Sequence, residues 1–421
     1  MSYAFTYHRS VEPQQNQQLR PLRLMRQYCL SGQAHLDSAL LDQIEQGYGQ
    51  GDDLCDAWVA VAQQLPAHGM RMFQQALDQG IDQVPDAPAE LKALFAQLEQ
   101  TPTWLKPELL NQGTATLARY PILQSLMLQS VSLMGGYAVP ALAQPLLETG
   151  ALAYSVLPRM ARTLLFAAAV TAPYGMQMRQ AGFKQGAHVR VIHALVRHKL
   201  RHSDTWPTAT YGIPINQSDL IATNLQFSLV VLYGLRVFGS QLSADERYAV
   251  LHLWRYIGYV MGLNVEQMPT SEHECNQWLY AYLSTQKMDS QKAKPLAQAL
   301  DQLPFLLADD NAVGRQSAYL EQQLRAGITR LFMGNTLADG LGLAKPRWLS
   351  PFLLGTAGSQ FVLDRLRHIQ PLGQLLEQGS VRYRNLIKAK YIRAEPSLAK
   401  PFAELESALL ALAAEQSAQA A

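Results

Sequence analysis

Apolar residues recur three and four positions apart along most of the chain, which is the spacing of one face of an α-helix. Leu54, Trp58 and Val61 form one such stripe directly after two aspartates, which suit the start of a helix. Short segments rich in Gly, Pro and Asp separate the periodic stretches. No stretch alternates apolar and polar residues between hairpin turns, as a strand would. The pattern therefore predicts an all-α fold.

The predicted helices are long in the middle of the chain and shorter towards the C-terminus. The main ones span residues 120–137, 147–170, 216–238, 269–284 and 315–334. Gly135-Gly136 should break the first and Pro158 should bend or interrupt the second. Residues 1–20 are polar and glutamine-rich, which predicts a flexible arm. No linker or repeat divides residues 21–421, so we interpret them as a single helical domain.

The run AHVRVIHALVRHKLRHS at residues 187–203 predicts a helix with four histidines. Its apolar stripe consists of Val189, Ile192, Val196 and Leu200, and His193 falls within it. Such a histidine is usually a core residue whose ring nitrogens bond to nearby groups. Arg190 and Arg197 flank it on nearly the same face, and an imidazole beside two guanidinium groups also suits a metal with a negatively charged periphery, such as heme. The residues alone leave both interpretations open.

Composition limits the partners and the compartment. A formal net charge of +2, with no basic cluster interleaved with aromatics, argues against nucleic acid. No apolar run reaches the about 18 residues of a membrane-spanning helix, which leaves at most peripheral membrane contact. Cys29, Cys55 and Cys275 form no zinc, redox or heme-attachment motif and favour a reducing compartment. With no secretory signal visible, we expect a cytoplasmic protein.

Four stretches of the chain resemble a known superfamily in order and separation. They are GQGDDLCDAWVA at 49–60, RMART at 159–163, VRVIHALVR at 189–197 and GIPINQSDLIAT at 212–223. The chain is similar to the superfamily that groups the latex-clearing proteins, or rubber oxygenases, with the MpaB-type oxygenases bound to the endoplasmic reticulum. The last two stretches are the more specific ones.

The resemblance implies a compact bundle with a globin-like, heme-binding core at about residues 49–335 and peripheral helices at both ends. It makes His193 the proximal iron ligand of heme b. Arg159 and Thr163 match the family's heme-site motif, and on a helix they share one face. The expected propionate partners are Arg159, Arg190 and Arg197, the expected polar groups near the iron are Arg162 and Thr163, and Thr223 is expected to line the pocket.

Two positions depart from the rubber oxygenases. Arg162 stands where they have a lysine, and arginine stays protonated, so an open or water-bound sixth iron position is expected. Ala143 stands at the offset of their paired glutamate, and the nearest carboxylate is Glu148. The resemblance implies a heme-b oxygenase that uses dioxygen to cleave a carbon–carbon double bond of an apolar small molecule, an isoprenoid or a lipid. The same residues would also serve a heme carrier or sensor without turnover.

Overall fold

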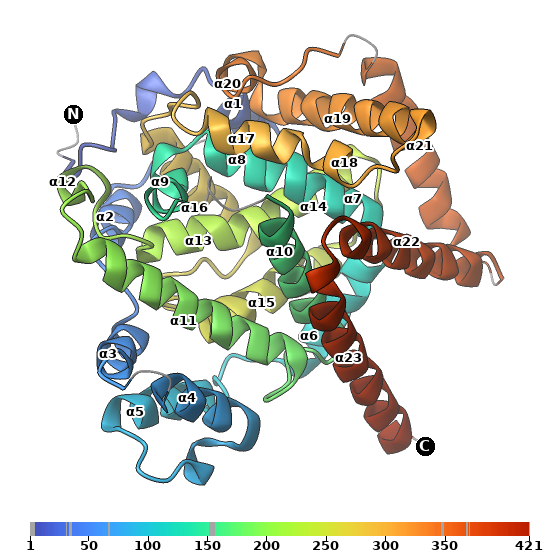
Figure 1. The fold of residues 1–421 in the computed structure, drawn as a ribbon. Helices are drawn as coiled ribbons and strands as arrows, with labels where there is room; N and C mark the ends of the chain where they lie inside the picture. Colours follow the sequence, from blue (N-terminus) through green and yellow to red (C-terminus); the bar gives the residue numbers. More distant parts are fainter. Residues whose placement is uncertain are drawn as a thin grey trace.

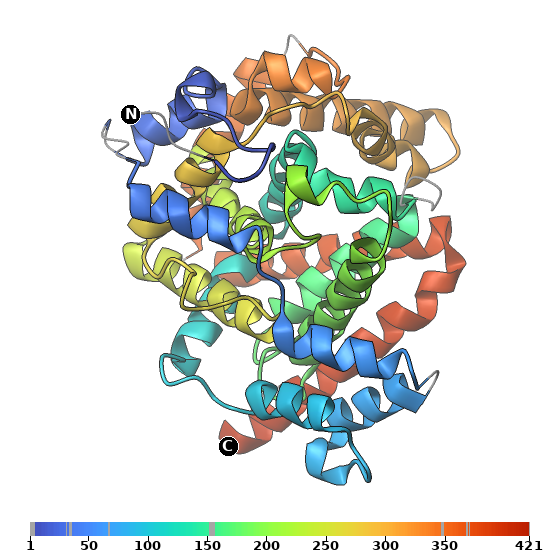
Figure 2. The ribbon, with the colours of Figure 1, turned by 90° about the vertical axis from the view of Figure 1, so that its left-hand side faces the viewer.

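The computed structural model describes residues 5–30, 32, 36–65, 68–150, 156–346, 349–367, 369 and 371–420. Helices account for nearly all of the regular structure in these residues (Figures 1 and 2). The β-structure among them is one isolated bridge between Ser10 and Gln286. The predicted all-α fold is therefore confirmed.

Short connections join the helices. Before the C-terminal region, two of the described helices, α11 and α19, are longer than twenty residues. In the first half they are η1 (Pro13–Gln15), α1 (Arg20–Tyr28), α2 (Ser38–Gly47), α3 (Asp53–Ala62), α4 (His68–Gln79), η2 (Ile81–Gln83), α5 (Ala89–Leu98), α6 (Pro107–Ala118), α7 (Pro121–Met127), the π-helix η3 (Leu128–Leu133), α8 (Met134–Tyr137), α9 (Pro140–Glu148), α10 (Val156–Val170) and α11 (Ala181–Arg201). The second half holds α12 (Thr208–Tyr211), α13 (Gln217–Phe227), α14 (Leu229–Val237), α15 (Ala244–Val260), α16 (Glu272–Thr285), α17 (Lys294–Asp301), α18 (Leu303–Leu306), α19 (Ala312–Met333), α20 (Asn335–Gly340), α21 (Leu349–Leu366), α22 (Leu372–Ala394), η4 (Pro396–Leu398) and α23 (Ala399–Ala420).

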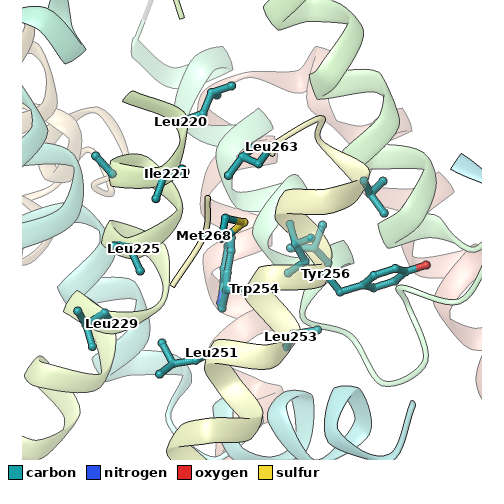
Figure 3. Close-up of a cluster of buried hydrophobic side chains, with 14 of the residues drawn as sticks. Leu220, Ile221, Leu225, Leu229, Leu251, Leu253, Trp254, Tyr256, Leu263 and Met268 are labelled. Atoms are coloured by element: carbon teal, nitrogen blue, oxygen red, sulfur yellow. The ribbon is translucent and has the colours of Figure 1, made fainter. Parts of the chain in front are cut away.

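Helix α15 is the central element of the core. It packs against α6, α11 and α13, and its Trp254 is buried in a cluster that also includes Leu225 and Met268 (Figure 3). A capping box of Ser243 and Glu246 starts α15, because each side chain accepts a hydrogen bond from the other residue's backbone N–H. Burying this apolar face is what fixes the position of α11 and α13 around the helix.

The predicted helix 216–238 is divided into α13 and α14 at Ser228, whose backbone departs from helical geometry with ψ at −79°. The Ser228 hydroxyl donates to the Asn224 carbonyl oxygen at 2.9 Å, a local bond that often bends helices. The span Gln217–Val237 is long and apolar enough to cross a membrane, but 61% of its apolar window is buried inside the protein. Such burial is typical of a core helix.

Two predictions about helix breaks are wrong. Gly135-Gly136 do not break the first middle helix, because α7 continues through the π-helix η3 into α8 and both glycines are buried inside it. The predicted helix 147–170 is two helices, since α9 ends at Glu148 and α10 begins at Val156. Pro158 lies in the first turn of α10, where a missing N–H costs little.

The prediction of a flexible arm at residues 1–20 is also wrong for the part that the structure describes. Arg9 is 2% exposed and donates to both carboxylate oxygens of Asp219, at 3.0 and 2.5 Å. Its guanidinium also lies over the Tyr48 ring, 4.1 Å from the centroid. Asn16 further ties the segment to the end of α16 through the Ser284 carbonyl oxygen at 2.9 Å. Residues 5–19 are therefore part of the folded body.

The C-terminal helices are longer than the short helices that the sequence predicts. Helix α23 packs against α10 and α11, and α22 packs against α7 and α10. Figure 1 shows α21 and α22 at the side of the molecule, lying at an angle to each other (together, the α21–α22 hairpin), with α23 running from the inner end of α22 towards the C-terminus. These peripheral helices cover the outer side of α10.

Candidate functional site

Helix α11 places the predicted histidine at the edge of its buried face. The buried residues include Phe183, Ala187, Val191 and Ala194, which pack against α3, α10 and α15. The predicted stripe is wrong at Ile192, which is 54% exposed. His193 is partly buried and lies between this core face and the exposed side of the helix. Its surroundings therefore decide whether it is an ordinary core residue.

The two arginines that flank the histidine are buried in ion pairs with helix α3. Arg190 donates to both oxygens of Asp52, from Nε at 2.6 Å and from Nη2 at 2.8 Å, and also to the Gln97 side chain at 2.5 Å. Arg197 donates from Nε to Asp56 at 2.8 Å and from Nη1 to the Ile215 carbonyl oxygen at 2.8 Å.

These bonds correct the expectation that Arg190 and Arg197 bind heme propionates. Their guanidinium groups already face carboxylates, and both side chains are at most 3% exposed. A Cβ added at Gly262 would lie 2.6 Å from Arg190 Nε, so the backbone also packs tightly around the first pair. The early Gly-Asp element of the sequence thus supplies the two aspartates that fix the orientation of α11.

His193 has an unusual environment for a core histidine. Its Nδ1 atom is buried and has no hydrogen-bond partner in the described part of the chain. The pKa of His193 is lowered to about 4, mainly by burial and also by the positive charge of Arg197. The negative charge of Asp52 acts in the opposite direction. The imidazole is therefore neutral at pH 7, which is the form that binds a metal.

The lack of a partner for Nδ1 among the described residues sets His193 apart from an ordinary core histidine. A buried imidazole that serves the core alone normally bonds both ring nitrogens to protein or water. An unpartnered nitrogen on a neutral ring is instead the expected state of a metal ligand. Among the described residues no group of three His, Cys, Asp or Glu lies close enough together to hold a metal ion.

Helix α10 runs beside α11 and carries the Arg-x-x-x-Thr element. Arg159 donates from Nη2 to the Tyr137 hydroxyl at 2.7 Å, while its Nη1 is buried and has no hydrogen-bond partner among the described residues. Thr163 donates to the Arg159 carbonyl oxygen at 3.1 Å and is partly buried. A buried, half-satisfied guanidinium fits an anionic group such as a heme propionate.

Two phenylalanines connect the faces of α10 and α13 through the central tryptophan. The ring centroid of Phe166 lies 6.5 Å from that of Trp254, and that of Phe227 lies 5.3 Å from it. Thr223, one turn before Phe227, is partly buried and donates to the Asp219 carbonyl oxygen at 2.8 Å. All of these side chains except Trp254 are partly accessible.

Arg162 and Glu148 are less engaged with these elements. Arg162 is exposed and makes no ion pair with the described residues. Glu148 accepts from the Gln144 amide at 2.7 Å and from the Thr205 hydroxyl at 2.9 Å, which holds it at the end of α9. Ala143, where the rubber oxygenases have glutamate, is fully buried. Ala143 therefore supplies no carboxylate, and the carboxylates of Asp52 and Asp56 are paired with Arg190 and Arg197.

Sequence reasoning missed the partners that organise these side chains. The sequence predicts Tyr137 only as part of a helix, Asp52 only as a helix start and Asp56 only as part of the stretch 49–60. Asp52 does accept from the Cys55 N–H at 3.3 Å as a cap. The number of aspartates at the start of α3 is a usable signal of a partner elsewhere in the chain. Asp56 lies one turn beyond the cap and has no capping role, so its carboxylate is available for another contact.

Comparison with known proteins places this core among oxygenases. A family model described as the catalytic domain of the ER-bound oxygenases mpaB/B' and rubber oxygenase matches residues 118–358, more than half of the chain. The chain is 28% identical to the rubber oxygenase of Streptomyces sp. (strain K30) over 159 residues, and this match spans 37% of each protein.

A solved structure extends the likeness beyond the matched sequence. The closed state of the latex clearing protein LCP superposes with a TM-score of 0.61 at 18% identity, covering 80% of this chain and 90% of the other. At that identity the superposition shows a shared helical fold. The family match contains Arg159, Thr163, His193 and Thr223, whereas Asp52 lies outside it.

Proposed function

We propose that this chain, which belongs to the catalytic-domain family of the ER-bound oxygenases mpaB/B' and the rubber oxygenases, is a heme-b dependent oxygenase. Its substrate would be an apolar, unsaturated small molecule, an isoprenoid or a lipid, and its co-substrate dioxygen. The expected reaction is oxidative cleavage of a carbon–carbon double bond into two carbonyl products. We further propose a cytoplasmic location, supported by three cysteines that are all free.

One observation carries the proposal: the neutral, partly buried imidazole of His193, with a ring nitrogen that no described residue satisfies. Histidine is a common proximal ligand of heme iron. The ion pairs of Arg190 and Arg197 would hold the helix so that this ring keeps one orientation. Such supporting contacts commonly orient a metal ligand.

The remaining residues would bind and orient the cofactor and the substrate. Arg159 would hold a propionate with its Nη1, which no described residue binds, while Tyr137 positions the guanidinium through Nη2. Thr163 and Arg162 would supply polar groups near the heme, and Thr223 would line the space with Phe227. Bound heme would supply the dioxygen chemistry, and the apolar helices would exclude water and align the double bond.

A second candidate function is a heme carrier or sensor without turnover. The specific observation in its favour is the environment of α9, where Ala143 replaces the family's glutamate and Glu148 bonds to Thr205. Without a glutamate at position 143, acid–base steps would have to depend on other groups. Heme binding alone would therefore not distinguish the two functions.

The first test is the absorption spectrum of protein produced with ample heme precursor. We expect a Soret band that is lost in His193→Ala and retained in His202→Ala, a matched control because His202 is exposed near the end of the same helix. A colourless, folded wild type would reject the proposal. Oxygen uptake with squalene or an unsaturated fatty acid, and carbonyl products by mass spectrometry, would then separate oxygenase from carrier.

A further inference from the structure

Exposed large apolar side chains are concentrated on the α21–α22 hairpin. Of the eighteen large apolar side chains exposed in the described residues, seven belong to this hairpin and its turn. They are Phe361, Val362, Ile369, Leu372, Leu375, Val381 and Leu386. Soluble monomers rarely gather exposed apolar side chains in one place unless the surface binds a partner.

The hairpin presents this surface outward because its inner side is anchored by a buried carboxylate. Asp364 accepts a hydrogen bond from the Tyr120 hydroxyl at 2.7 Å and another from the Gln241 backbone N–H at 2.7 Å. Val362 lies on the opposite side of α21 by helical spacing and is 52% exposed. No atom lies within 4 Å of a Cβ built at Gly355 or Gly358, so this side of α21 is open.

The same hairpin is strongly basic although the whole chain is close to neutral. Residues 349–394 contain seven Lys and Arg but two Asp and Glu, one of which is the buried Asp364. The basic residues without an ion pair in the described part are Arg365, Arg382, Arg384 and Lys390. The Arg365 guanidinium lies 4.8 Å from the centroid of the exposed Phe361 ring, which places positive charge directly beside apolar surface.

We propose that the α21–α22 hairpin docks on the surface of a lipid bilayer that contains anionic lipids. Exposed Leu, Ile, Val and Phe side chains beside arginines and lysines are the composition of interfacial, peripherally bound helices. The apolar groups enter the boundary between headgroups and acyl chains, and the unpaired cations meet the negative headgroups. A second copy of the chain is a poorer occupant, because it would bring two positively charged hairpins together.

This docking goes beyond the proposed oxygenase function and does not depend on heme. The family match ends at residue 358, so it includes Leu349 to Gly358 of α21 and none of α22. Helix α22 packs directly against α10, so the hairpin joins the membrane surface to the element that carries Arg159. A bilayer is also where an apolar lipid substrate dissolves, so docking would bring the protein to it.

Vesicle flotation with the full-length protein tests the inference. We expect binding to vesicles of phosphatidylcholine mixed with phosphatidylserine, and binding at least about tenfold weaker to phosphatidylcholine alone or at high salt. Leu372→Glu with Leu375→Glu should reduce binding by about tenfold or more. Arg382→Glu with Arg384→Glu should act similarly. Val313→Glu, at a residue 79% exposed on α19, is the control that should bind like wild type.

Other outcomes overturn the proposal in identifiable ways. Equal binding of all variants would place the membrane contact elsewhere, and no binding to the mixed vesicles would exclude it. If light scattering shows a wild-type dimer that the Leu372→Glu, Leu375→Glu variant dissociates, and vesicle binding is absent, a second copy covers the hairpin. The substituted side chains are exposed, and circular dichroism confirms that the variants fold. Because no step involves heme, a colourless protein can still bind vesicles.

Discussion

Replacing Asp52 by Asn should destabilise the protein strongly. Asp52 and Arg190 are joined by two hydrogen bonds, and their side chains are 5% and 3% exposed. Removing one charge leaves the other buried and uncompensated, which typically costs about 3–5 kcal/mol. Asparagine caps helices as well as aspartate does, so the bond from the Cys55 N–H to the capping side chain is preserved. The loss of stability in Asp52→Asn therefore reports the removal of the negative charge and not the loss of the helix cap.

The measurement is the free energy of unfolding from urea titration of the apoprotein. Asp310→Asn is the matched control, because Asp310 pairs with Arg315 at 3.1 Å where both side chains are largely exposed. Exposed pairs contribute about 0–1 kcal/mol, so this control should unfold close to wild type. Arg190→Leu and the double variant complete a mutant cycle, which isolates the coupling between the two residues.

The reasoning fails if Asp52→Asn loses no more stability than Asp310→Asn. It also fails if the two single substitutions are additive in the double variant, since a direct pair must show coupling. Heme retention gives a second readout. Arg190 lies one turn before His193, so a loosened ion pair should weaken heme binding as well as stability.

Three further predictions follow from other contacts. His252 accepts from the Lys106 N–H at 3.1 Å, and burial, helped by the charges of Arg255 and Lys106, lowers its pKa from 6.5 to about 4. The folded state thus disfavours protonation of His252. The stability that the neutral ring contributes is fully present above pH 6.5, and the free energy of unfolding falls by up to about 3 kcal/mol as the pH drops to 4. Urea unfolding of His252→Gln should therefore show a shallower pH dependence. Arg9→Met should cost about 3–5 kcal/mol and expose residues 5–19 to protease, because Asp219 stays buried; unchanged proteolysis would contradict it. Tyr137→Phe should weaken heme binding about tenfold with little effect on the fold, measured by heme titration, because Arg159 loses the hydroxyl at 2.7 Å.

Local periodicity predicted the helices well because each helix buries a stripe that the sequence displays directly. The predicted helices 269–284 and 315–334 correspond to α16 and α19, and the stripe of Leu54, Trp58 and Val61 lies in α3. The failures occur where distant residues decide the outcome. Arg9 is buried by a carboxylate 210 positions away, and a polar, glutamine-rich composition cannot reveal such a partner. The π-helix η3 likewise depends on packing and leaves no period in the sequence.

The candidate site shows the same limit on a smaller scale. His193 could be chosen from spacing and resemblance, but the partners of its neighbours could not. Arg190 and Arg197 meet aspartates 138 and 141 positions earlier in the chain. A periodicity argument counts arginines as polar. The predicted buried face of α11 therefore included Ile192 and left out the side of the helix on which Arg190 and Arg197 are buried.

The paired aspartates on α3 suggest what two buried ion pairs contribute to α11. Such pairs are expensive to desolvate and give little net stability compared with apolar contacts. They do fix register: Arg190 and Arg197 are seven residues apart, about 10.5 Å along the helix, and a shift of one turn or a rotation by one residue would break both pairs. Rotation by one residue would also bring Ile192 or Ala194 to the place of His193. The double variant of Asp52 and Arg190 decides between the two roles, because recovered stability without recovered heme binding means that the pairs aim the histidine.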